Sequence, residues 1–407
     1  MLAPEPFFEP RGTPFSEYHR IKALGELGHS VDLVTYPFGQ DVELPNLRIF
    51  RCLRPPFVRR VAIGPSITKV VLDALLAMTA IRRALSERYD AIHSHEEAGV
   101  VGVWLARWLG IPHLYDMHSS LPQQLTNFRY SASPWLRRLV QWAEHRMIDG
   151  SRVVITVCKA LQDAVTEIGA GSRAVLIENV MGGDVDEIPS GPGDVRETWG
   201  ISARAPLALY TGTFEPYQGL ELLMAAAAAL ARTHPEARVM VVGGEPAQVE
   251  EAQRTARATG ARLVFTGLQP PSEVPRFIAA CDILVSPRIA GTNTPLKIYS
   301  YLRTGKPIVA TNLLTHTQVL DERTAVLVPP EAAAFAAAIG YLIDHPVERG
   351  RLAAAAQTLA AAKYSRSAYL DKTREAYARL LNVQCGMQIA AAVGVVHCAL
   401  RIVDSSL

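Results

Sequence analysis

Short apolar runs alternate with longer helical patterns along almost the whole chain, and this alternation constrains the fold more than any other feature. Six runs recur in the second half, from Leu207–Tyr210 to Val326–Val328, with Ala-rich helical stretches such as Leu220–Ala231 between them. Strands that alternate with helices form βαβ units, which build parallel sheets covered by helices on both faces. The pattern therefore predicts an α/β fold.

Five runs of the same kind lie in the first half. The expected strands are Val31–Val34, Ala91–His93, Pro112–Tyr115, Val153–Thr156 and Val175–Ile177. A Gly- and Pro-rich stretch without periodicity, Met181–Gly193, separates the halves, and 407 residues suffice for two domains. We predict two Rossmann-like, doubly wound parallel-sheet domains that face each other across a cleft. The expected limits are 1–190 and 200–365 for the domains, 366–382 for a closing helix and 383–407 for an apolar tail of unknown role.

Charge and cysteine usage exclude several classes of protein. The 41 Lys and Arg against 39 Asp and Glu leave a net charge of +2, without the excess of cations that nucleic acid binding needs. The five cysteines are never in CxxC spacing, which disfavours a zinc site and indicates a reducing compartment. The N-terminus lacks a signal-peptide pattern, so a cytoplasmic location is expected. Polar residues interrupt the apolar segment Cys385–Val403, which disfavours a membrane span.

A strand, a glycine loop and a helix follow one another between Ile283 and Tyr299. Thr294 is expected to cap this helix, with Pro295 as its first residue, so that free backbone N–H groups form an anion site. Lys297 in the first turn opposes the helix dipole, as residues at functional sites often do. Lys297 and Arg288 are therefore candidate phosphate ligands, and the alternative is that both are solvated surface charges.

A second glycine loop follows the first strand of the second half and contains Gly212 and Gly219. Its sequence is not GxGxxG, so a dinucleotide fingerprint is unsupported. The glycines would let the backbone approach a ligand closely, although a plain turn between strand and helix is the alternative.

Polar residues follow two expected strands of the first half. His95 and Glu96 come after one strand, and Asp116 and His118 come after the next, so both pairs are expected at the cleft edge. A histidine there can donate a hydrogen bond to a substrate hydroxyl or phosphate, and the alternative is a solvated loop residue. The P-loop, GxSxG and HExxH patterns are absent from the sequence.

Together these segments resemble the family 4 glycosyltransferases, which have the two-domain GT-B architecture, from about Glu9 to about Leu381. The stretches that carry the resemblance are Pro10–Pro14, Leu27–Val31, Tyr115–His118, Thr211–Gly219, Phe265–Gly267, Leu296–Tyr299 and Gly305–Thr311. The resemblance implies transfer of a sugar from a nucleotide diphosphate sugar, bound mainly by the C-terminal domain. It also implies retention of the anomeric configuration, an N-terminal domain on the acceptor side, and no metal ion or other cofactor.

The resemblance also implies roles for individual residues. His118 would contact the transferred sugar and, with Lys297, form the catalytic set, while Thr13, His95 and Glu96 would lie on the acceptor side. The expected donor-binding residues are Gly12, Gly212, Thr213, Gln218, Gly267, Leu268, Arg288, Thr292, Asn293, Thr294 and Ser300.

The chain departs from the family pattern at two pairs of positions. Thr213 and Gln218 replace the Arg and Lys that usually contact the diphosphate, so two cations are missing from the expected site. Thr292 and Ser300 occupy the positions of the usual pair of glutamates. We expect Lys297, Arg288 and the helix N-terminus to compensate for the lost cations.

The acceptor is less defined than the donor. Arg51, Arg54, Arg59 and Arg60 lie among apolar residues before an expected helix, Ile67–Met78, and a second basic amphipathic stretch spans Trp135–Trp142. Such surfaces can rest on an anionic membrane, which favours a lipid-linked or glycan acceptor at the inner face of the membrane and a role in cell envelope polysaccharide synthesis. The alternatives are a small-molecule acceptor and, for Trp135–Trp142, an ordinary packed helix. Two alternatives stay open: a sugar-nucleotide epimerase, and a degenerate GT-B protein that binds a ligand or partner without turnover.

Overall fold

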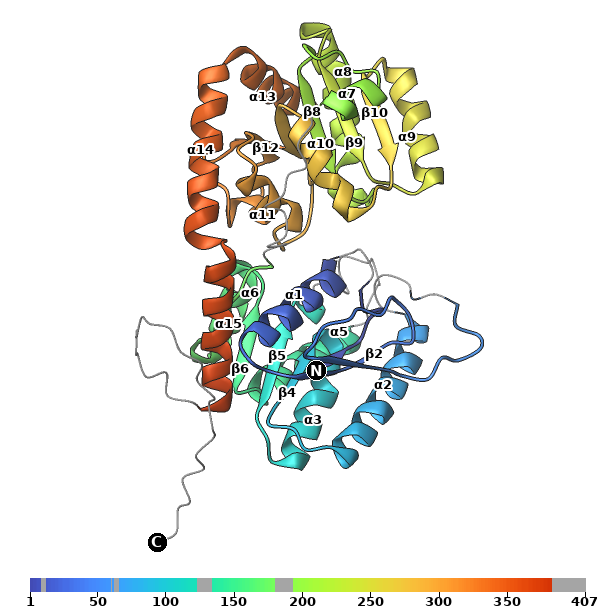
Figure 1. The fold of residues 1–407 in the computed structure, drawn as a ribbon, viewed down its shortest axis with the longest axis vertical. Helices are drawn as coiled ribbons and strands as arrows, with labels where there is room; N and C mark the ends of the chain where they lie inside the picture. The colour runs from blue at the N-terminus through green and yellow to red at the C-terminus, as the bar shows by residue number, and fades with distance from the viewer. Residues whose placement is uncertain (9–11, 60, 62–65, 123–133, 180–192, 383–407) are drawn as a thin grey trace.

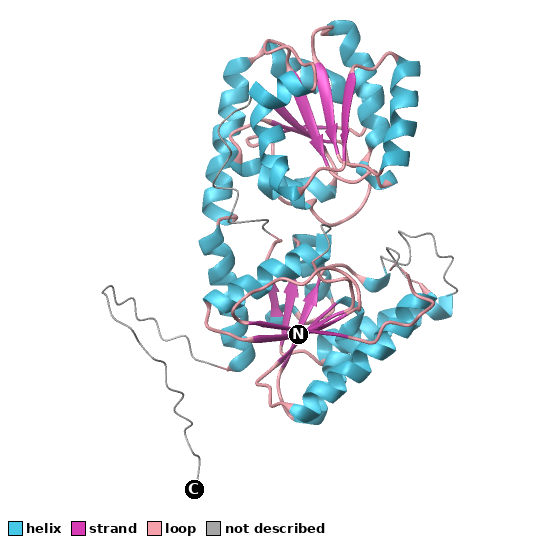
Figure 2. Ribbon diagram, turned by 45° about the vertical axis from the view of Figure 1, so that its right-hand side comes forward, coloured by secondary structure: helices cyan, strands magenta, loops and turns pink. Residues whose placement is uncertain are grey.

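The structure is a computed structural model and describes residues 1–8, 12–59, 61, 66–122, 134–179 and 193–382. Two parallel sheets lie one above the other, each flanked by helices (Figure 1). The arrows of both sheets point toward the other domain, so the carboxyl ends of the two sets of strands face each other (Figure 2). The predicted fold class, two doubly wound parallel-sheet domains in the GT-B arrangement, is confirmed.

The N-terminal sheet has seven strands in the order β3-β2-β1-β4-β5-β6-β7, all parallel. Its strands are β1 (Leu2–Ala3), β2 (Val31–Thr35), β3 (Leu47–Arg51), β4 (Ile92–His95), β5 (His113–Met117), β6 (Val153–Thr156) and β7 (Ala174–Leu176). The helices of this half are α1 (Gly12–Glu26), α2 (Ile67–Ser86), η1 (Glu96–Ala98), α3 (Gly99–Leu109), α5 (Pro134–Asp149), α6 (Lys159–Glu167) and η2 (Gly171–Arg173).

The C-terminal sheet has six strands in the order β10-β9-β8-β11-β12-β13, again all parallel. The strands are β8 (Leu207–Thr211), β9 (Arg238–Val242), β10 (Leu263–Gly267), β11 (Ile283–Ser286), β12 (Ile308–Thr311) and β13 (Val326–Val328). The helices up to the last strand are α7 (Gly193–Thr198), η4 (Pro216–Gln218), α8 (Leu220–Thr233), α9 (Pro246–Thr259), η5 (Pro271–Glu273), α10 (Val274–Ala280), α11 (Leu296–Arg303) and α12 (Leu314–Thr317).

Three helices end the described chain, and the last one returns to the N-terminal domain. Helices α13 (Ala332–Asp344) and α14 (Pro346–Lys363) pack on the C-terminal domain, whereas α15 (Arg366–Leu381) packs against α1, β6 and β7 (Figure 1). Tyr369, Tyr377 and Leu380 of α15 belong to the apolar core that also contains Ile21 and Leu24 of α1. The last helix therefore completes the core of the first domain.

The sequence pattern did not predict β3, and this omission changes the interpretation of Arg51. Strand β3 is an edge strand that buries little surface, so its Leu47–Arg51 segment carries no long apolar run. Arg51 pairs with Asp41 at 2.7 Å and donates to backbone carbonyl groups of the preceding loop, including that of Gln40. Arg51 is therefore a structural residue, while Leu53 and Phe57 stay more than 70% exposed.

No helix within the described ranges is long and apolar enough to cross a membrane. Four predicted features lie outside the described residues: the apolar tail 383–407, Arg60, most of the Met181–Gly193 stretch, and the Pro10–Arg11 part of the Pro10–Pro14 stretch.

Candidate active site

Strands β4 and β5 run two residues further than the sequence pattern predicted. His95 and Asp116 are therefore strand residues with no exposed surface, and they do not lie in loops after the strands. His118 follows β5 directly and is 5% exposed. The carboxyl ends of β4 and β5 thus carry a buried polar cluster at the edge of the sheet that faces the second domain.

Asp116 lies at the centre of this cluster. Its carboxylate is 3.4 Å from Nε of Arg20, 3.4 Å from Nε2 of His93 and 3.3 Å from Nε2 of His118. Burial alone would raise the pKa of Asp116, but His118 and the Arg20 guanidinium hold it well below its usual range. Asp116 is therefore an ionised carboxylate that faces one permanent cation.

The other titratable groups of the cluster are uncharged near neutral pH. Burial lowers the pKa of His118, lowers that of His93 to about 4 and lowers that of His95 well below its usual range. Burial and the neighbouring Glu5 raise the pKa of Glu17 well above its usual range. The cluster is therefore charge-balanced, because one anion and one cation lie among neutral neighbours.

Three neighbours surround His118. Its Nε2 lies 3.2 Å from Nδ1 of His95, and its Nδ1 lies 3.5 Å from Nδ2 of Asn179. Its backbone carbonyl accepts a hydrogen bond of 2.5 Å from Nδ2 of Asn293, which belongs to the C-terminal domain. His118 is thus the residue of the N-terminal cluster that touches the second domain.

The turn that carries His118 is fixed by two carboxylates. Ser119 donates to both carboxylate oxygens of Glu96, at 3.0 and 3.1 Å, and the backbone N–H of Leu121 donates to Glu144 at 2.6 Å. Burial and the neighbouring Glu97 raise the pKa of Glu96 well above its usual range. Glu96 therefore supports the turn and is a poor nucleophile in this environment.

His93, His95 and Asp116 have ligand atoms within 4.8 Å of one another, a spacing that a metal ion would accept. The same carboxylate, however, already faces the Arg20 guanidinium at 3.4 Å. A permanent cation at that distance opposes the binding of a second one. We therefore interpret these residues as a polar network and not as a metal centre.

The C-terminal half of the site is built around Lys297. Its Nζ is buried without a hydrogen-bond partner among the described residues and lies 3.8 Å from the centre of the Tyr210 ring. A methyl group added to Gly212, whose φ is +148°, would lie only 2.8 Å from this Nζ. Burial and the neighbouring Arg288 hold the pKa of Lys297 well below its usual range. Lys297 is thus a buried amine beside the glycine loop, with no acceptor in the part of the chain that the structure describes.

Arg288 fixes the two glycine loops against each other. Its guanidinium lies 4.9 Å from the centre of the Tyr217 ring, and the backbone N–H of Ile289 donates to the carbonyl of Tyr217 at 3.0 Å. Gly219, with a φ of +76°, packs so closely that an added Cβ would lie 2.0 Å from the carbonyl oxygen of Pro287. Arg288 and Lys297, which we call the basic cradle, therefore sit on a rigid backbone frame.

The prediction that Thr294 caps α11 is wrong. Helix α11 begins at Leu296, its N-cap is Pro295, and no side chain caps it. The extended conformation at Pro295 postpones the first helical residue to Leu296. Thr294 is instead a buried residue, 7% exposed, in the loop before the helix.

The remaining predicted residues take varied positions. Thr213 and Leu268 are exposed, whereas Gln218 is half-buried, with its Oε1 unpaired among the described residues. Gly267, with a φ of +71°, ends β10, and Ser300 lies on α11. Thr292 accepts a hydrogen bond from Gln318 at its carbonyl, and Gly12 and Thr13 open α1.

Asn293 joins the two domains, a position that the sequence did not reveal. Besides donating to the carbonyl of His118, its side-chain oxygen accepts from Sγ of Cys158 at 3.5 Å. Close by, the backbone N–H of Ala160 donates to Oε1 of Gln318 at 2.8 Å. Asn293 thus ties the loop before α11, the helix that carries Lys297, to the end of the N-terminal cluster at His118.

Two family descriptions match the chain: "Glycosyl transferase 4-like domain" over residues 18–179 and "Glycosyl transferases group 1" over residues 205–345. The D-inositol 3-phosphate glycosyltransferase 2 of Catenulispora acidiphila is 30% identical over 313 residues, which are 72% of this chain and 71% of that protein. The chain belongs to the family 4 glycosyltransferases. The predicted family is thereby confirmed.

Solved structures of glycosyltransferases share this fold. The sucrose-phosphate synthase of Thermosynechococcus elongatus matches with a TM-score of 0.75 and 19% identity over 94% of this chain and 99% of that chain. HepE of Anabaena, solved in complex with UDP and glucose, matches with a TM-score of 0.69 and 20% identity over 93% of this chain and 98% of that chain.

Several residues of this glycosyltransferase site escaped the sequence analysis: Glu17, Arg20, His93, Asn179, Tyr210 and Tyr377. Arg20 and Glu17 lie in α1, whose sequence has no marked apolar face, and Arg20 is buried where α15 returns to this domain. A contact between residues 353 positions apart, such as that of Arg20 with Thr373, leaves no local pattern. His93, in contrast, could have been noticed from its alternation with His95 along β4.

Proposed function

We propose that this glycosyltransferase moves a sugar from a nucleotide diphosphate sugar to a hydroxyl group of its acceptor, with retention of configuration. The observation that carries the proposal is the buried Nζ of Lys297, which lies beside Gly212 and close to Arg288 and has no acceptor among the described residues. A buried amine without a partner is costly, and a diphosphate would supply both the negative charge and the acceptor oxygens. HepE, which has the same fold, was solved with UDP and glucose.

The basic cradle would also favour the departure of the diphosphate. Two cations near the leaving group stabilise the charge that develops on it, which is how charged clamps accelerate group transfer. Arg288 and Lys297 thereby replace the two family cations that are absent at Thr213 and Gln218. No metal ion is needed in this scheme.

His118 would contact the transferred sugar from the opposite side. Because Asp116 accepts only, we assign the proton of the neutral His118 ring to Nε2, which leaves Nδ1 as an acceptor toward Asn179. A sugar hydroxyl that displaces the amide of Asn179 would donate to that nitrogen. For the retaining step, the departing diphosphate would take the acceptor proton, since Glu96 is held by Ser119.

The acceptor we propose is a lipid-linked or glycan hydroxyl at a membrane surface, in cell envelope synthesis. Large apolar side chains stay exposed on the N-terminal domain next to arginines, as is typical of surfaces that rest on anionic lipid. Examples are Phe57 at 73% exposure, Trp135 at 70% and Trp142 at 57%, the last under Arg146. The inositol phosphate acceptor in the name of the Catenulispora relative is the alternative class, a soluble polyol phosphate.

Thermal unfolding with UDP, GDP, ADP, CDP and dTDP, with and without a chelator, tests the donor class. One diphosphate is expected to raise the melting temperature by several degrees, and the chelator should not change the shift. NMR of the product made from the matching sugar nucleotide then reads the anomeric configuration. Inversion would contradict the proposed mechanism, and failure of all five diphosphates to shift a folded protein would favour a GT-B protein without turnover.

A further inference from the structure

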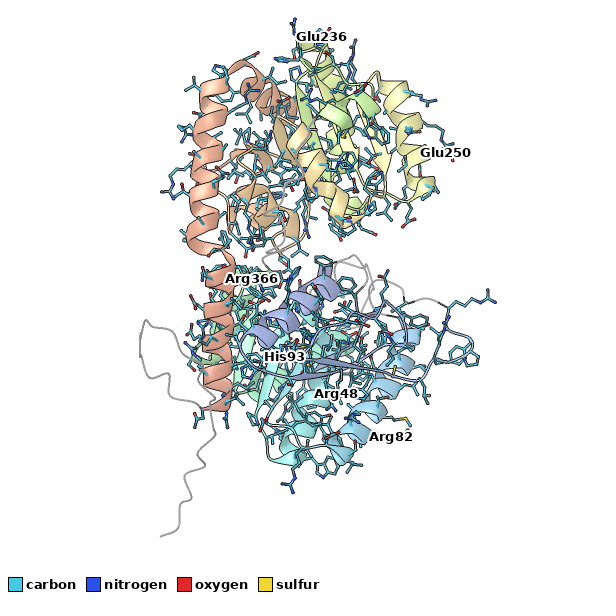
Figure 3. All side chains as sticks on the ribbon, in the orientation of Figure 1. Arg48, Arg82, His93, Glu236, Glu250 and Arg366 are labelled. Carbon is cyan, nitrogen blue, oxygen red and sulfur yellow. The ribbon has the colours of Figure 1, made fainter. Side chains whose placement is uncertain are left out.

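The last helix reaches the polar cluster from a distance of more than 250 residues in the sequence. Oη of Tyr377, on α15, lies 2.6 Å from Nδ1 of His93, and both side chains are buried. His93 lies inside the N-terminal domain, whereas α15 begins with Arg366 at the junction of the two domains (Figure 3). The hydroxyl of Tyr377 therefore contacts a neighbour of Asp116 and touches no residue that we placed at the substrates.

The chemistry of the partners fixes the direction of each hydrogen bond. The ionised carboxylate of Asp116 only accepts, so the neutral His93 carries its proton on Nε2, which is 3.4 Å from Asp116. Nδ1 of His93 then has a lone pair, and Tyr377 must donate to it. Burial raises the pKa of Tyr377 well above its usual range, so the phenol keeps the proton that it donates.

The same helix also supports the second partner of Asp116. Nη1 of Arg20 donates to Oγ1 of Thr373 at 3.1 Å, and the Arg20 guanidinium lies 5.0 Å from the centre of the Tyr369 ring. Thr373 donates in turn to the carbonyl of Tyr369, which leaves its oxygen free to accept from Arg20. Helix α15 thus holds both His93 and Arg20 against the carboxylate.

We propose that Tyr377 is a positioning residue for His118, acting through His93 and Asp116. With the Tyr377 hydroxyl in place, Nε2 of His93 faces one oxygen of Asp116 at 3.4 Å. The other oxygen lies 3.3 Å from Nε2 of His118, which is also 3.2 Å from Nδ1 of His95. Without the hydroxyl, Nδ1 of His93 loses its hydrogen-bond donor, and the ring is free to turn so that its Nε2–H no longer faces the carboxylate. Asp116 would then shift, and the tautomer and orientation of His118 would no longer be fixed.

The inference rests on the proposed function only where it concerns turnover, because the state of the His118 ring can be measured without substrate. The test uses the full chain with ¹⁵N-labelled histidine and the variant Tyr377→Phe, which keeps the ring and removes the hydroxyl. Tyr369→Phe is the matched control, since it removes a hydroxyl from the same helix and core and keeps the ring that lies against Arg20.

The ring nitrogen resonances of His118, assigned with a His118→Gln variant, are expected to move in Tyr377→Phe from a single Nε2–H pattern toward mixed tautomers. Turnover of Tyr377→Phe is expected to fall about three- to tenfold, as for the loss of one hydrogen bond, with an unchanged KM for the donor, and Tyr369→Phe leaves both quantities as in the wild type.

Resonances of His118 that are identical in Tyr377→Phe and the wild type would overturn the inference, whatever the protein catalyses. If Tyr377→Phe does not fold, Thr373→Val removes the support of Arg20 and is expected to move the same resonances. If the resonances move as expected and no sugar nucleotide is turned over by the wild type, the inference holds and the proposed function fails.

Discussion

The N-terminal cluster and the basic cradle both contain buried charged groups, but they differ in how these charges are paired. In the N-terminal cluster, the carboxylate of Asp116 and the guanidinium of Arg20 lie 3.4 Å apart among neutral neighbours. In the basic cradle, Lys297 and Arg288 are partly or wholly buried, and Nζ of Lys297 has no acceptor among the described residues. The charges of the first half therefore balance within the protein, whereas a bound anion would supply the acceptor that Lys297 lacks among the described residues.

Removal of the anion from the N-terminal cluster has the largest expected effect. Asp116→Asn leaves Arg20 as a buried cation without its counterion, so we expect a loss of about 3–5 kcal/mol in the free energy of unfolding. Chemical denaturation of the unliganded protein measures this loss. Asp371→Asn, which breaks an exposed pair with Arg374, serves as control and should cost under about 1 kcal/mol. Equal losses of stability in the two variants would contradict the interpretation that Asp116 is the buried counterion of Arg20.

Acid should weaken the N-terminal cluster through His93. The pKa of His93 is about 4 in the folded protein and 6.5 in the unfolded chain. Between these two pH values the unfolded chain binds a proton that the folded protein does not bind. Stability therefore falls as the pH drops through this window, by about 3 kcal/mol from this residue. Unfolding free energies of His93→Gln should depend less on pH than those of the exposed variant His345→Gln. The same slope in both would contradict the pKa assignment.

Removal of a charge from the basic cradle is expected to stabilise the unliganded protein, whereas removal of Asp116 destabilises it. Lys297→Met removes a buried amine that has no acceptor among the described residues. The free energy of unfolding of the unliganded protein is therefore expected to rise by about 1–3 kcal/mol. The wild type also gains stability as the pH rises toward 10.5, because the lowered pKa of Lys297 lets the folded state lose its proton first, and the variant should lack this rise. Destabilisation of the unliganded variant would show that Lys297 has a structural partner instead.

The smallest effect concerns the contact between the halves. Asn293→Ala removes the hydrogen bond to the carbonyl of His118, and we expect kcat/KM to fall about fivefold, or about 1 kcal/mol, with little change in the stability of either domain. Gln357→Ala, which removes a hydrogen bond to Arg303 inside the C-terminal domain, is the matched variant and should leave kcat/KM unchanged. A similar loss in both would argue that Asn293 does not align the halves.

The sequence predicted the basic cradle better than the N-terminal cluster, because the cradle is built from neighbouring residues and the cluster from distant segments. All six strands of the C-terminal sheet follow from buried apolar runs, and α15 ends one residue before the predicted limit at 382. Lys297 and Arg288 could be recognised because both lie in one continuous strand, loop and helix segment, Ile283–Tyr299. The N-terminal cluster depends on α15 covering α1, a contact between distant segments, so Arg20 and Tyr377 gave no signal. Strand β3 was missed because an edge strand needs little apolar sequence.

The central claim, that Lys297 awaits a diphosphate, is tested most directly by calorimetric titration of the nucleoside diphosphate identified in the thermal screen into three proteins. The wild type and Lys363→Met, which changes an exposed lysine of α14, are expected to bind alike, and Lys297→Met is expected to bind at least 100-fold more weakly, about 2.7 kcal/mol. Unchanged affinity in a folded Lys297→Met protein would contradict the account.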